Sequence, residues 1–523
     1  MADETALPLV MPGLLAWAAA RHGERIALRD GDVTLDFITL AARARDASRA
    51  FLAAGIRRGD RFAIWAPNRY EWILAALGAQ NIGAILVPLN TRMKGAEAAY
   101  ILERSGARML FTVGEFAGNR YPQMLAGIAL PALERTVLFG GAAGGLAGWE
   151  DFVAAGRAVS DAEVQAAETA VMPDDTLDLM FTSGTTGKPK GVMTGHAQNI
   201  RSFDTWSRTV GLGADDHYLV INPFFHSFGY KAGWLAAIIC GARILPVASF
   251  DVDEVLKRIQ FERVSMLPGP PTIYQSLLAH PERQNYDLSS LRLAVTGAAA
   301  VPVDLIRRMR SELGFRTVLT AYGLTETCGV VTITGAQDEP ELIATTAGRA
   351  MPGVEVICVN GAGEPVPVGE PGEVCVRGFN VMQGYFDDPA ATAEAITPDG
   401  WLKTGDIGVL NEAGYLRITD RIKDMFIVGG FNCYPAEIEN LLCSLGGVAQ
   451  AAVIGVPDER MGEVAKAFVV RRAGSTLTEQ EVIDWCRRNM ANYKVPRSVA
   501  FVDALPLNAA GKVLKTALRE RPG

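Results

Sequence analysis

Residues 182–191 bring together the side chains that bind phosphate groups in proteins. This segment, TSGTTGKPKG, follows a mostly apolar run over residues 177–181. Its glycines let the backbone approach an anion closely, its hydroxyl groups can donate to phosphate oxygens, and Lys188 and Lys190 add positive charge. A generic surface loop could share this composition, but the density of hydroxyls, glycines and lysines in one short segment favours a phosphate-binding loop.

Two familiar nucleotide-binding loops do not fit this segment. The Walker A pattern places four residues between its first glycine and the Gly-Lys-Ser/Thr that follows. Here Thr182 stands where that glycine belongs, and Lys188 is followed by Pro189. The dinucleotide pattern G-x-G-x-x-G is also absent from this segment. A P-loop NTPase and a dinucleotide fold are therefore poor explanations.

A second segment, AYGLTET over residues 321–327, carries an aromatic ring close to a carboxylate. The ring of Tyr322 offers a stacking surface for a purine, and a carboxylate such as Glu326 needs a cation between itself and a triphosphate. Standing alone, this segment would be explained better as a strand end with a capping Thr-Glu pair.

Four more polar or charged residues lie in distinctive segments. Asp406 ends WLKTGD, and its carboxylate can accept hydrogen bonds from a diol. Arg421 follows in DRIKD, Lys512 ends PLNAAGK, and His226 lies among aromatic residues in NPFFHSFG. Taken singly, these residues would be a surface turn, a salt-bridge partner, a solvated lysine and a core histidine.

The order of these segments resembles the adenylate-forming superfamily of acyl-CoA synthetases, peptide-synthetase adenylation domains and beetle luciferases. The matching motifs run from Thr182 to Lys512, so the resemblance covers essentially the whole chain. It implies a two-step reaction, in which a carboxylate and MgATP form acyl-AMP and pyrophosphate before a thiol displaces AMP. The implied cofactors are ATP, Mg²⁺ and coenzyme A as co-substrate.

The resemblance also implies roles for individual residues. It assigns nucleotide contacts to Thr182, Ser183, Gly184, Thr185, Thr186, Gly187, Lys190, Gly297, Ala298, Ala299, Ala321, Tyr322, Gly323, Thr325, Asp406, Arg421 and Lys512. It assigns catalytic roles to Lys512, Glu326, His226 and Thr325. Tyr322 would stack on adenine, Thr325 would contact the α-phosphate, and Glu326 would hold Mg²⁺. Asp406 and Arg421 would bind the ribose.

A cation at Lys512 has a clear chemical use. A carboxylate that attacks the α-phosphate brings two anionic groups together, and a bridging cation stabilises the transition state. By resemblance, Lys423 is the hinge of the C-terminal domain, and Gly429 and Gly430 line the tunnel for the pantetheine arm of coenzyme A. Two adjacent glycines allow a narrow, amide-bearing chain to approach closely.

A further set of residues is expected to line the acyl pocket. Its expected lining is Phe225, His226, Tyr230, Lys231, Ala298, Leu324 and Val330. Lys231 could pair with a second polar group on the acid. Many relatives have a second glycine where Ala298 stands, so this alanine could narrow the pocket. His226 would position the carboxylate or gate the thiol, and we do not assign it as a general base.

Alternating helical and strand-like patterns favour an α/β fold. The resemblance implies that this fold contains a large N-terminal domain and a small mobile α+β domain. We predict an ATP- and acyl-binding domain over residues 1–420 and a lid domain with the catalytic lysine over residues 421–523. The clearest expected elements are a strand over 291–296, a helix from Pro302, a helix from Pro435, strands over 451–456 and 467–470, and a capping box at Thr478 and Glu481 before another helix.

Composition restricts the class of protein. The chain has 523 residues, of which 49% are hydrophobic, and a formal net charge of −8, which argues against nucleic acid as a partner. The seven cysteines contain no C-x-x-C pair and suggest reduced, mostly buried thiols. The apolar stretches over 5–20 and 72–91 are broken by prolines or polar residues, so we expect a cytoplasmic protein without an integral membrane segment. We also allow for a homodimer.

The resulting prediction is an ATP-dependent carboxylic acid:CoA ligase. The segments over 221–233 and 267–278 look most similar to bacterial ligases that act on propanoate side chains of partly degraded steroid rings. We therefore expect a polycyclic or a medium- to long-chain acid. A stand-alone enzyme that loads a carrier protein is the nearest alternative. A luciferase-like oxygenase and a regulatory nucleotide-binding module without catalysis are more distant ones.

Overall fold

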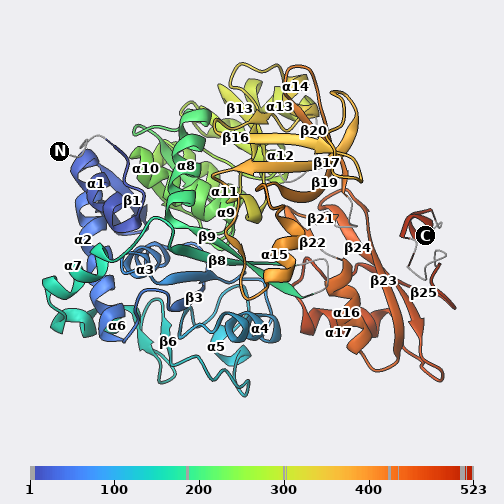
Figure 1. Ribbon diagram of the computed structural model, residues 1–523, viewed down its shortest axis with the longest axis horizontal. Coiled ribbons are helices and arrows are strands. Elements are labelled where there is room, and N and C mark those ends of the chain that lie inside the picture. Colours follow the sequence, from blue (N-terminus) through green and yellow to red (C-terminus); the bar gives the residue numbers. More distant parts are fainter. Residues whose placement is uncertain are drawn as a thin grey trace.

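Two mixed β-sheets with helices packed around them form the N-terminal body, and a smaller sheet with its own helices follows at the C-terminus (Figure 1). The computed structural model describes residues 6–183, 188–297, 301, 303–421, 426–433, 435–506, 513 and 515–520. The predicted α/β fold with a large N-terminal and a smaller C-terminal part is confirmed.

The first sheet holds the predicted phosphate-binding segment. Its eight strands pair in the order β18 (Gly384–Tyr385), β9 (Pro189–Gly195), β8 (Thr176–Ser183), β4 (Ile85–Pro88), β3 (Arg61–Trp65), β5 (Met109–Thr112), β6 (Arg135–Leu138) and β7 (Ala147–Gly148). The strands from β8 to β7 run parallel, and their centre is apolar and buried, as in β3, because both faces are covered. Strand β9 pairs antiparallel with β8, and β18 pairs antiparallel with β9.

The second sheet has two halves joined through Met266, which bridges Tyr218 on one side and Leu293 on the other. One half contains β2 (Val33–Asp36), β1 (Ile26–Asp30), β11 (Arg243–Pro246) and β10 (His217–Val220). The other contains β12 (Leu293–Gly297), β13 (Thr317–Tyr322), β14 (Thr332–Ile333) and β15 (Arg349–Ala350). The strand expected over 291–296 is thus confirmed as β12.

An antiparallel sheet and a mixed sheet complete the chain. The first contains β16 (Val354–Val359), β17 (Pro371–Gly378), β19 (Leu402–Leu410) and β20 (Leu416–Arg421). The C-terminal sheet contains β22 (Phe431–Cys433), β21 (Phe426–Val428), β24 (Gly462–Arg471), β23 (Val448–Asp458) and β25 (Ser498–Phe501), the last of which runs parallel to β24. Figure 1 shows this sheet to one side of the body.

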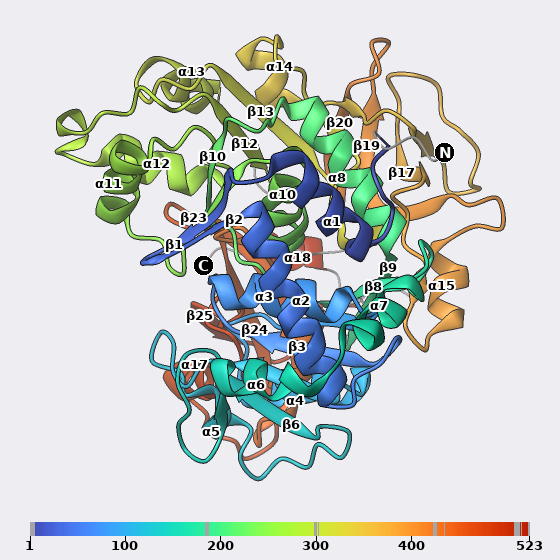
Figure 2. The same cartoon turned by 90° about the vertical axis from the view of Figure 1, so that its left-hand side faces the viewer.

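Helices surround these sheets, as Figure 2 shows for α1, α2 and α3 on one side of the body. In the body they are α1 (Met11–His22), α2 (Phe37–Ala53), α3 (Tyr70–Gln80), α4 (Gly95–Ser105), α5 (Tyr121–Met124), α6 (Trp149–Ala155), α7 (Asp161–Thr169), α8 (His196–Val210), α9 (Ser227–Gly229), α10 (Ala236–Cys240), α11 (Val252–Glu262), α12 (Pro271–Ala279), α13 (Val303–Ser311), α14 (Pro340–Thr345) and α15 (Pro389–Ala395). Short 3₁₀ helices are η1 (Gly156–Ala158), η3 (Arg283–Asn285) and η4 (Thr325–Thr327), and η2 (Tyr230–Leu235) is a π-helical turn.

The C-terminal part has a hydrophobic core of its own, built by α16 (Pro435–Ser444), α17 (Glu479–Asn489) and the inner face of the sheet. The last helix is α18 (Lys515–Arg519). The predicted helix start at Pro435 and the capping box of Thr478 and Glu481 are confirmed. The division of the chain at 420/421 stays a prediction.

The cysteine side chains are mostly buried, as predicted. Cys328, Cys358, Cys375, Cys433 and Cys486 are buried, Cys240 is partly buried, and Cys443 on α16 is exposed. Burial raises the pKa of Cys328 to about 11. Among the described residues, no helix combines the length and the apolar character that a membrane span requires.

A buried ion pair joins the two strands of the phosphate-binding hairpin to η2. The Lys231 ammonium lies 3.1 Å from Asp178 Oδ1 on β8 and donates to Thr194 Oγ1 on β9 at 2.9 Å. Thr194 in turn donates to the same Asp178 oxygen at 2.7 Å. The side chains of Lys231 and Asp178 are both 0% exposed, so each charge depends on the other for compensation.

We expect Lys231→Met to lower the free energy of unfolding by about 3–5 kcal/mol, because the Asp178 carboxylate would stay buried without its cation. Urea unfolding followed by tryptophan fluorescence measures this change. Lys257→Met, at an exposed lysine of α11, is the matched control and should have little effect. Adding Asp178→Leu to Lys231→Met should recover part of the loss. A Lys231→Met variant as stable as the unaltered protein would contradict this account.

Candidate active site

A cavity of about 760 Å³ lies between the N-terminal body and the C-terminal part. Residues from three regions line it. From the first sheet and its loops come Asn90, Glu97, Tyr100, Met180, Phe181, Thr182, Lys188 and Pro189. From elsewhere in the body come Phe225, His226 and Thr325, and from the C-terminal part come Gly430, Phe431, Glu437, Leu441, Ser444, Asn489, Tyr493 and Lys494.

The described residues of the predicted phosphate-binding segment lie at the ends of two antiparallel strands at this cavity. Strands β8 and β9 pair antiparallel, with Thr182 opposite Lys190 and Ser183 opposite Pro189. Residues 184–187, which include Gly184, Thr185, Thr186 and Gly187, lie outside the described residues, as does the Ser183 side chain. Thr182 and Lys188 thus bring a hydroxyl group and a cation to the cavity wall.

The ends of β12 and β13 meet closely at predicted nucleotide-binding residues. Gly297 pairs with Ala321, and a Cβ atom on Gly297 would lie 2.9 Å from the Ala321 carbonyl oxygen. A Cβ atom on Gly323 would lie 2.4 Å from the carbonyl oxygen of Gly329. Both positions therefore require glycine for close backbone packing. Ala298 and Ala299 lie outside the described residues.

Tyr322 and Asp406 come together, although 84 positions separate them in the chain. The Tyr322 hydroxyl donates to Asp406 Oδ2 at 2.6 Å, and Asp406 on β19 is 2% exposed. On the neighbouring strand β20, Arg421 is paired with Asp406, but its side chain is outside the described part of the chain. A side-chain hydrogen bond between strands of two different sheets thus holds an aromatic ring and a carboxylate side by side.

Glu326 has a hydroxyl partner and a nearby lysine. The Tyr385 hydroxyl donates to Glu326 Oε1 at 3.0 Å, and the Lys190 ammonium lies 5.0 Å from the centre of the Tyr385 ring. The backbone N–H of Met382 donates to the Glu326 carbonyl at 2.8 Å and fixes η4 in place. Burial raises the pKa of Glu326, and the Asp406 charge adds to this effect while Lys190 opposes it.

The surroundings of Glu326 fit a divalent cation that is held mainly by substrate. Within the described ranges, Glu326 forms no ion pair with a lysine or arginine, so its carboxylate has spare acceptor capacity. The same ranges contain no group of three or more His, Cys, Asp or Glu side chains that could hold a metal ion by themselves. Mg²⁺ is commonly bound through one or two carboxylates together with substrate phosphates, which matches one carboxylate beside a phosphate-binding hairpin.

His226 opens onto the cavity in a defined tautomer. The Phe228 N–H donates to His226 Nδ1 at 3.2 Å. Although the ring surface faces the cavity, the surrounding protein lowers the pKa of His226 to about 4 through burial, so the ring is neutral at pH 7. Because Nδ1 accepts a hydrogen bond, the neutral ring carries its proton on Nε2. His226 can therefore donate a hydrogen bond into the cavity.

Two of the residues expected in the acyl pocket lie elsewhere. Tyr230 and Lys231 are both 0% exposed, and the Tyr230 hydroxyl accepts from Gln80 Nε2 at 2.7 Å. The expectation that Lys231 pairs with the acid is not met in this arrangement, because Asp178 and Thr194 already engage its ammonium group. The apolar environment of η2 makes these two residues part of the core.

The other expected pocket residues differ in their access to the cavity. Phe225 and His226 line the cavity wall. Leu324 is partly buried and Val330 is 2% exposed, and neither belongs to that wall. Ala298 is outside the described residues.

Gly429 and Gly430 form the two-residue turn between β21 and β22. Their φ values are 55° and 84°, which favour glycine at both positions of this tight hairpin turn. A Cβ atom on Gly429 would lie 2.4 Å from the Met461 methyl carbon, and one on Gly430 would lie 3.5 Å from Pro270 of the body. The turn thus reaches across to the body, and Gly430 lines the cavity.

Several residues at the site escaped the sequence analysis. Tyr385 reaches Glu326 because β18 pairs with β9, and no local pattern around Tyr385 predicts that pairing. Glu97, Tyr493 and Lys494 line the cavity from opposite parts of the chain and have no motif around them. Two residues of the prediction, Lys423 and Lys512, lie outside the described residues.

Comparison with known proteins places this geometry in context. The model of the family described as "AMP-binding enzyme" matches residues 15–386, and that of the "AMP-binding enzyme C-terminal domain" matches residues 437–512. A protein of Rhodococcus jostii named 3-[(3aS,4S,7aS)-7a-methyl-1,5-dioxo-octahydro-1H-inden-4-yl]propanoyl:CoA ligase is 51% identical over 522 residues, which cover 99% of each chain. A feruloyl-CoA synthase of Amycolatopsis is 37% identical and covers 98% of this chain and 99% of the relative.

Solved structures show the same architecture. An o-succinylbenzoate CoA synthetase double mutant of Bacillus subtilis, bound to a product analogue, superposes with a TM-score of 0.81 at 30% identity. This match covers 97% of this chain and 98% of that one. An amide bond synthetase of Marinactinospora thermotolerans has a TM-score of 0.84 at 28% identity and covers 97% of this chain and 99% of that one.

We expect Glu326→Gln to raise the thermal midpoint of the ligand-free protein by a few degrees at pH 8. The pKa of Glu326 is raised in the folded state, so this carboxyl favours folding while protonated and loses that contribution as pH rises through its folded-state pKa. The difference in thermal midpoint between Glu326→Gln and the unaltered protein should therefore shrink as the pH falls toward 4.5. Scanning calorimetry at several pH values measures this difference.

The exposed Glu412 provides the matched control, because Glu412→Gln removes a carboxylate that is already in solvent. Its midpoint should follow that of the unaltered protein at every pH. A Glu326→Gln variant that is less stable at pH 8 would show that the carboxylate stabilises this region.

Proposed function

This chain belongs to the AMP-binding enzyme family, and on that premise we propose that its central cavity is where a carboxylic acid is joined to coenzyme A. The chain is an ATP-dependent acid–thiol ligase of the acyl-CoA synthetase type. In the first half-reaction an acid oxygen attacks the α-phosphorus of ATP, and the bond to pyrophosphate breaks. In the second, the thiol sulfur attacks the acyl carbon, and the bond to AMP breaks.

The nucleotide would lie between the phosphate-binding hairpin and the Tyr322–Asp406 pair. Thr182 and Lys188 line the cavity, and Asp406 accepts from Tyr322 beside Glu326. In this arrangement Tyr322 would offer its ring to adenine, Asp406 would accept from the ribose hydroxyls, and Thr325 would donate to the α-phosphate. Glu326 would hold Mg²⁺, which would supply positive charge to the phosphate oxygens.

His226 would orient the acid by donating a hydrogen bond. Its Nδ1 accepts from a backbone N–H and its pKa is lowered to about 4 by burial, so Nε2–H is a donor at neutral pH. A neutral donor suits a carboxylate that must keep its negative charge until it attacks phosphorus. Proton abstraction by His226 is not needed in this step, because the attacking carboxylate is already ionised.

The arrangement of the two parts suits the second half-reaction. Gly430 and Phe431 line the cavity together with His226 and Thr325, so a narrow chain that passes the glycine turn would reach the reacting centre. Lys512 is the last residue of the C-terminal family match, and Gly430 lies in the hairpin of β21 and β22, which belongs to the C-terminal sheet. Both would not face the acyl adenylate at once, and we propose a rotation about Lys423 between the half-reactions.

The acid we propose is a propanoate attached to a fused-ring steroid fragment. The observation that carries this proposal is the 51% identity, over 99% of both chains, to the Rhodococcus jostii ligase whose name gives such an acid. A Mycobacterium tuberculosis relative with the same name is 52% identical over 474 residues. We further propose a cytoplasmic location, and a homodimer stays a prediction.

Pyrophosphate release should be fastest with a bicyclic steroid-fragment propanoate and slower with octanoate, palmitate and ferulate. Release in the presence of ATP, Mg²⁺ and free coenzyme A gives kcat/KM for each acid, and chromatography identifies the acyl-CoA product. Acetate or benzoate as the best acid would refute the proposed substrate class. Pyrophosphate release without acyl-CoA product, for every acid tested, would favour a carrier-protein thiol as acceptor.

Lys512→Ala should lower acid-dependent ATP–pyrophosphate exchange by roughly 100-fold or more, because the cation that bridges the carboxylate and the α-phosphate is lost. Conversion of a preformed acyl adenylate to acyl-CoA should change little. The matched control is Lys515→Ala, since Lys515 lies nearby in the chain and pairs with Glu439. Exchange that persists in Lys512→Ala would refute the role of this lysine.

A further inference from the structure

A cluster of three charged side chains holds the C-terminal part against the body. The Lys494 ammonium donates to Glu97 Oε1 at 2.8 Å and to Glu437 Oε1 at 2.5 Å. These side chains are only 5%, 12% and 15% exposed, so the cluster is largely shielded from water. Figure 1 shows α4, which carries Glu97, and α16, which carries Glu437, on facing sides of the seam.

The two ion pairs of this cluster differ in what they connect. Glu437 and Lys494 both belong to the C-terminal part, so their contact can persist when that part moves as a unit. Glu97 belongs to the body, so its contact with Lys494 exists only while the two parts are docked in this arrangement. The Glu97–Lys494 pair is therefore specific to one orientation, whereas the Glu437–Lys494 pair is not.

Lys494 is the shared cation of two carboxylates that lie on opposite sides of the seam. Burial lowers the pKa of Lys494, but Tyr493 and the two carboxylates raise it more, so the pKa lies well above the ordinary value. Burial raises the pKa of Glu437, although Lys494 acts against this, and the negative charge of Glu97 raises it further. Without the ammonium, two carboxylates would face each other across the seam, which would push the two parts apart.

Contacts next to the cluster connect it to the glycine turn at the cavity. Tyr493 accepts from Asn90 Nδ2 of the body at 3.3 Å, and its ring stacks on Phe431 at a centroid distance of 4.8 Å. The guanidinium carbon of Arg92, which belongs to the body, lies 4.1 Å from the centre of the Phe431 ring. Because Phe431 directly follows Gly430, this set of contacts fixes the turn against the cavity.

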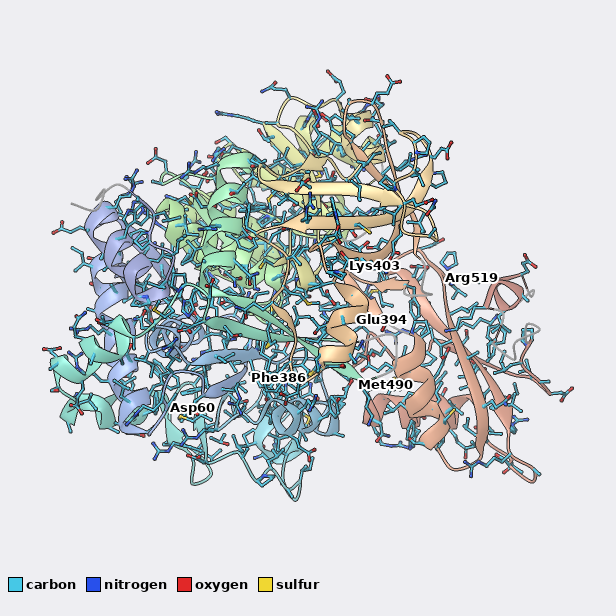
Figure 3. All side chains as sticks on the ribbon, in the orientation of Figure 1. Asp60, Phe386, Glu394, Lys403, Met490 and Arg519 are labelled. Atoms are coloured by element: carbon cyan, nitrogen blue, oxygen red, sulfur yellow. The ribbon has the colours of Figure 1, made fainter. Side chains whose placement is uncertain are left out.

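The body side of the pair is itself held in place. Glu97 Oε2 accepts from the Lys94 backbone N–H at 2.8 Å, which caps the start of α4. The carboxylate thus uses one oxygen for the helix and the other for Lys494. Figure 3 labels Met490, shortly before Tyr493 in the chain, at the edge of the C-terminal part nearest the body.

We propose that Glu97 and Lys494 are positioning residues for thioester formation, because their ion pair selects the orientation in which Gly430 lines the cavity. This inference rests on the two half-reactions proposed above. Adenylation would use the other orientation, which brings Lys512 to the nucleotide and separates Glu97 from Lys494. The pair therefore favours the second half-reaction over the first.

The test measures the two half-reactions separately in the full-length enzyme. Acid-dependent ATP–pyrophosphate exchange follows adenylation, and rapid quench of preformed acyl adenylate with coenzyme A follows thioester formation, both with the best acid of the screen. Glu97→Gln keeps an oxygen that can cap α4, and Lys494→Met keeps the length of the side chain. Each variant should slow thioester formation roughly 10- to 100-fold and leave exchange within about 2-fold of the unaltered enzyme.

A double variant separates electrostatic docking from a merely structural role. Lys494→Met leaves Glu97 and Glu437 facing each other, so adding Glu97→Gln should remove repulsion and restore part of the thioester rate. Glu103→Gln, at an exposed glutamate of the same helix, is the matched control and should alter neither half-reaction. Exchange activity reports in each case that the body is folded.

The outcomes distinguish this inference from the proposed function. An unaltered enzyme that shows neither exchange nor acyl-CoA formation with any acid would overturn the proposed function. An unaltered enzyme that shows both, together with variants that lose both half-reactions equally or neither of them, would overturn the positioning role alone. A double variant slower in thioester formation than Lys494→Met would also overturn it.

Discussion

Burial of carboxylates is the constraint on which this site depends. Asp178, Asp406, Glu326, Glu97 and Glu437 all lie away from bulk water, and each needs compensation. Asp178 has a lysine within the core, and the two glutamates at the seam share another. Glu326 accepts from a tyrosine hydroxyl, and the charge of Lys190 opposes the rise in its pKa that burial causes. A carboxylate in that condition is suited to a cationic ligand.

Two β-hairpins bring predicted site segments to the same cavity. One is formed by β8 and β9, where Thr182 and Lys188 line the cavity, and the other is formed by β21 and β22 with their glycine turn. The strands of the first hairpin are held by the Lys231–Asp178 pair, whereas the second hairpin depends on contacts between the C-terminal part and the body. Paired strands thus carry cavity-lining residues from both the body and the C-terminal part.

Features that depend on neighbouring residues could be predicted from the sequence, whereas contacts between residues far apart in the chain could not. The capping box at Thr478 and the helix start at Pro435 depend on neighbouring residues, and both are confirmed. The resemblance pointed to Tyr322 and Asp406, but their direct hydrogen bond depends on how β13 and β19 pack. Lys231 lies in the core and not at the expected acyl pocket, because it pairs with Asp178, which is 53 positions away in the chain and which no local pattern connects to it. The pairing of Glu97 with Lys494, 397 positions apart, has no local signal at all.

The distribution of thiols has a practical consequence. Burial leaves Cys328 and Cys240 protonated at neutral pH, since it raises the pKa of each well above 7, to about 11 and about 12. The exposed thiol of Cys443 lies on α16, beside Leu441 and Ser444 of the cavity wall and on the same helix as Glu437. A maleimide fluorophore would therefore attach preferentially to the C-terminal part of the native chain. Its emission would report, without engineered cysteines, whether that part is docked or released during turnover.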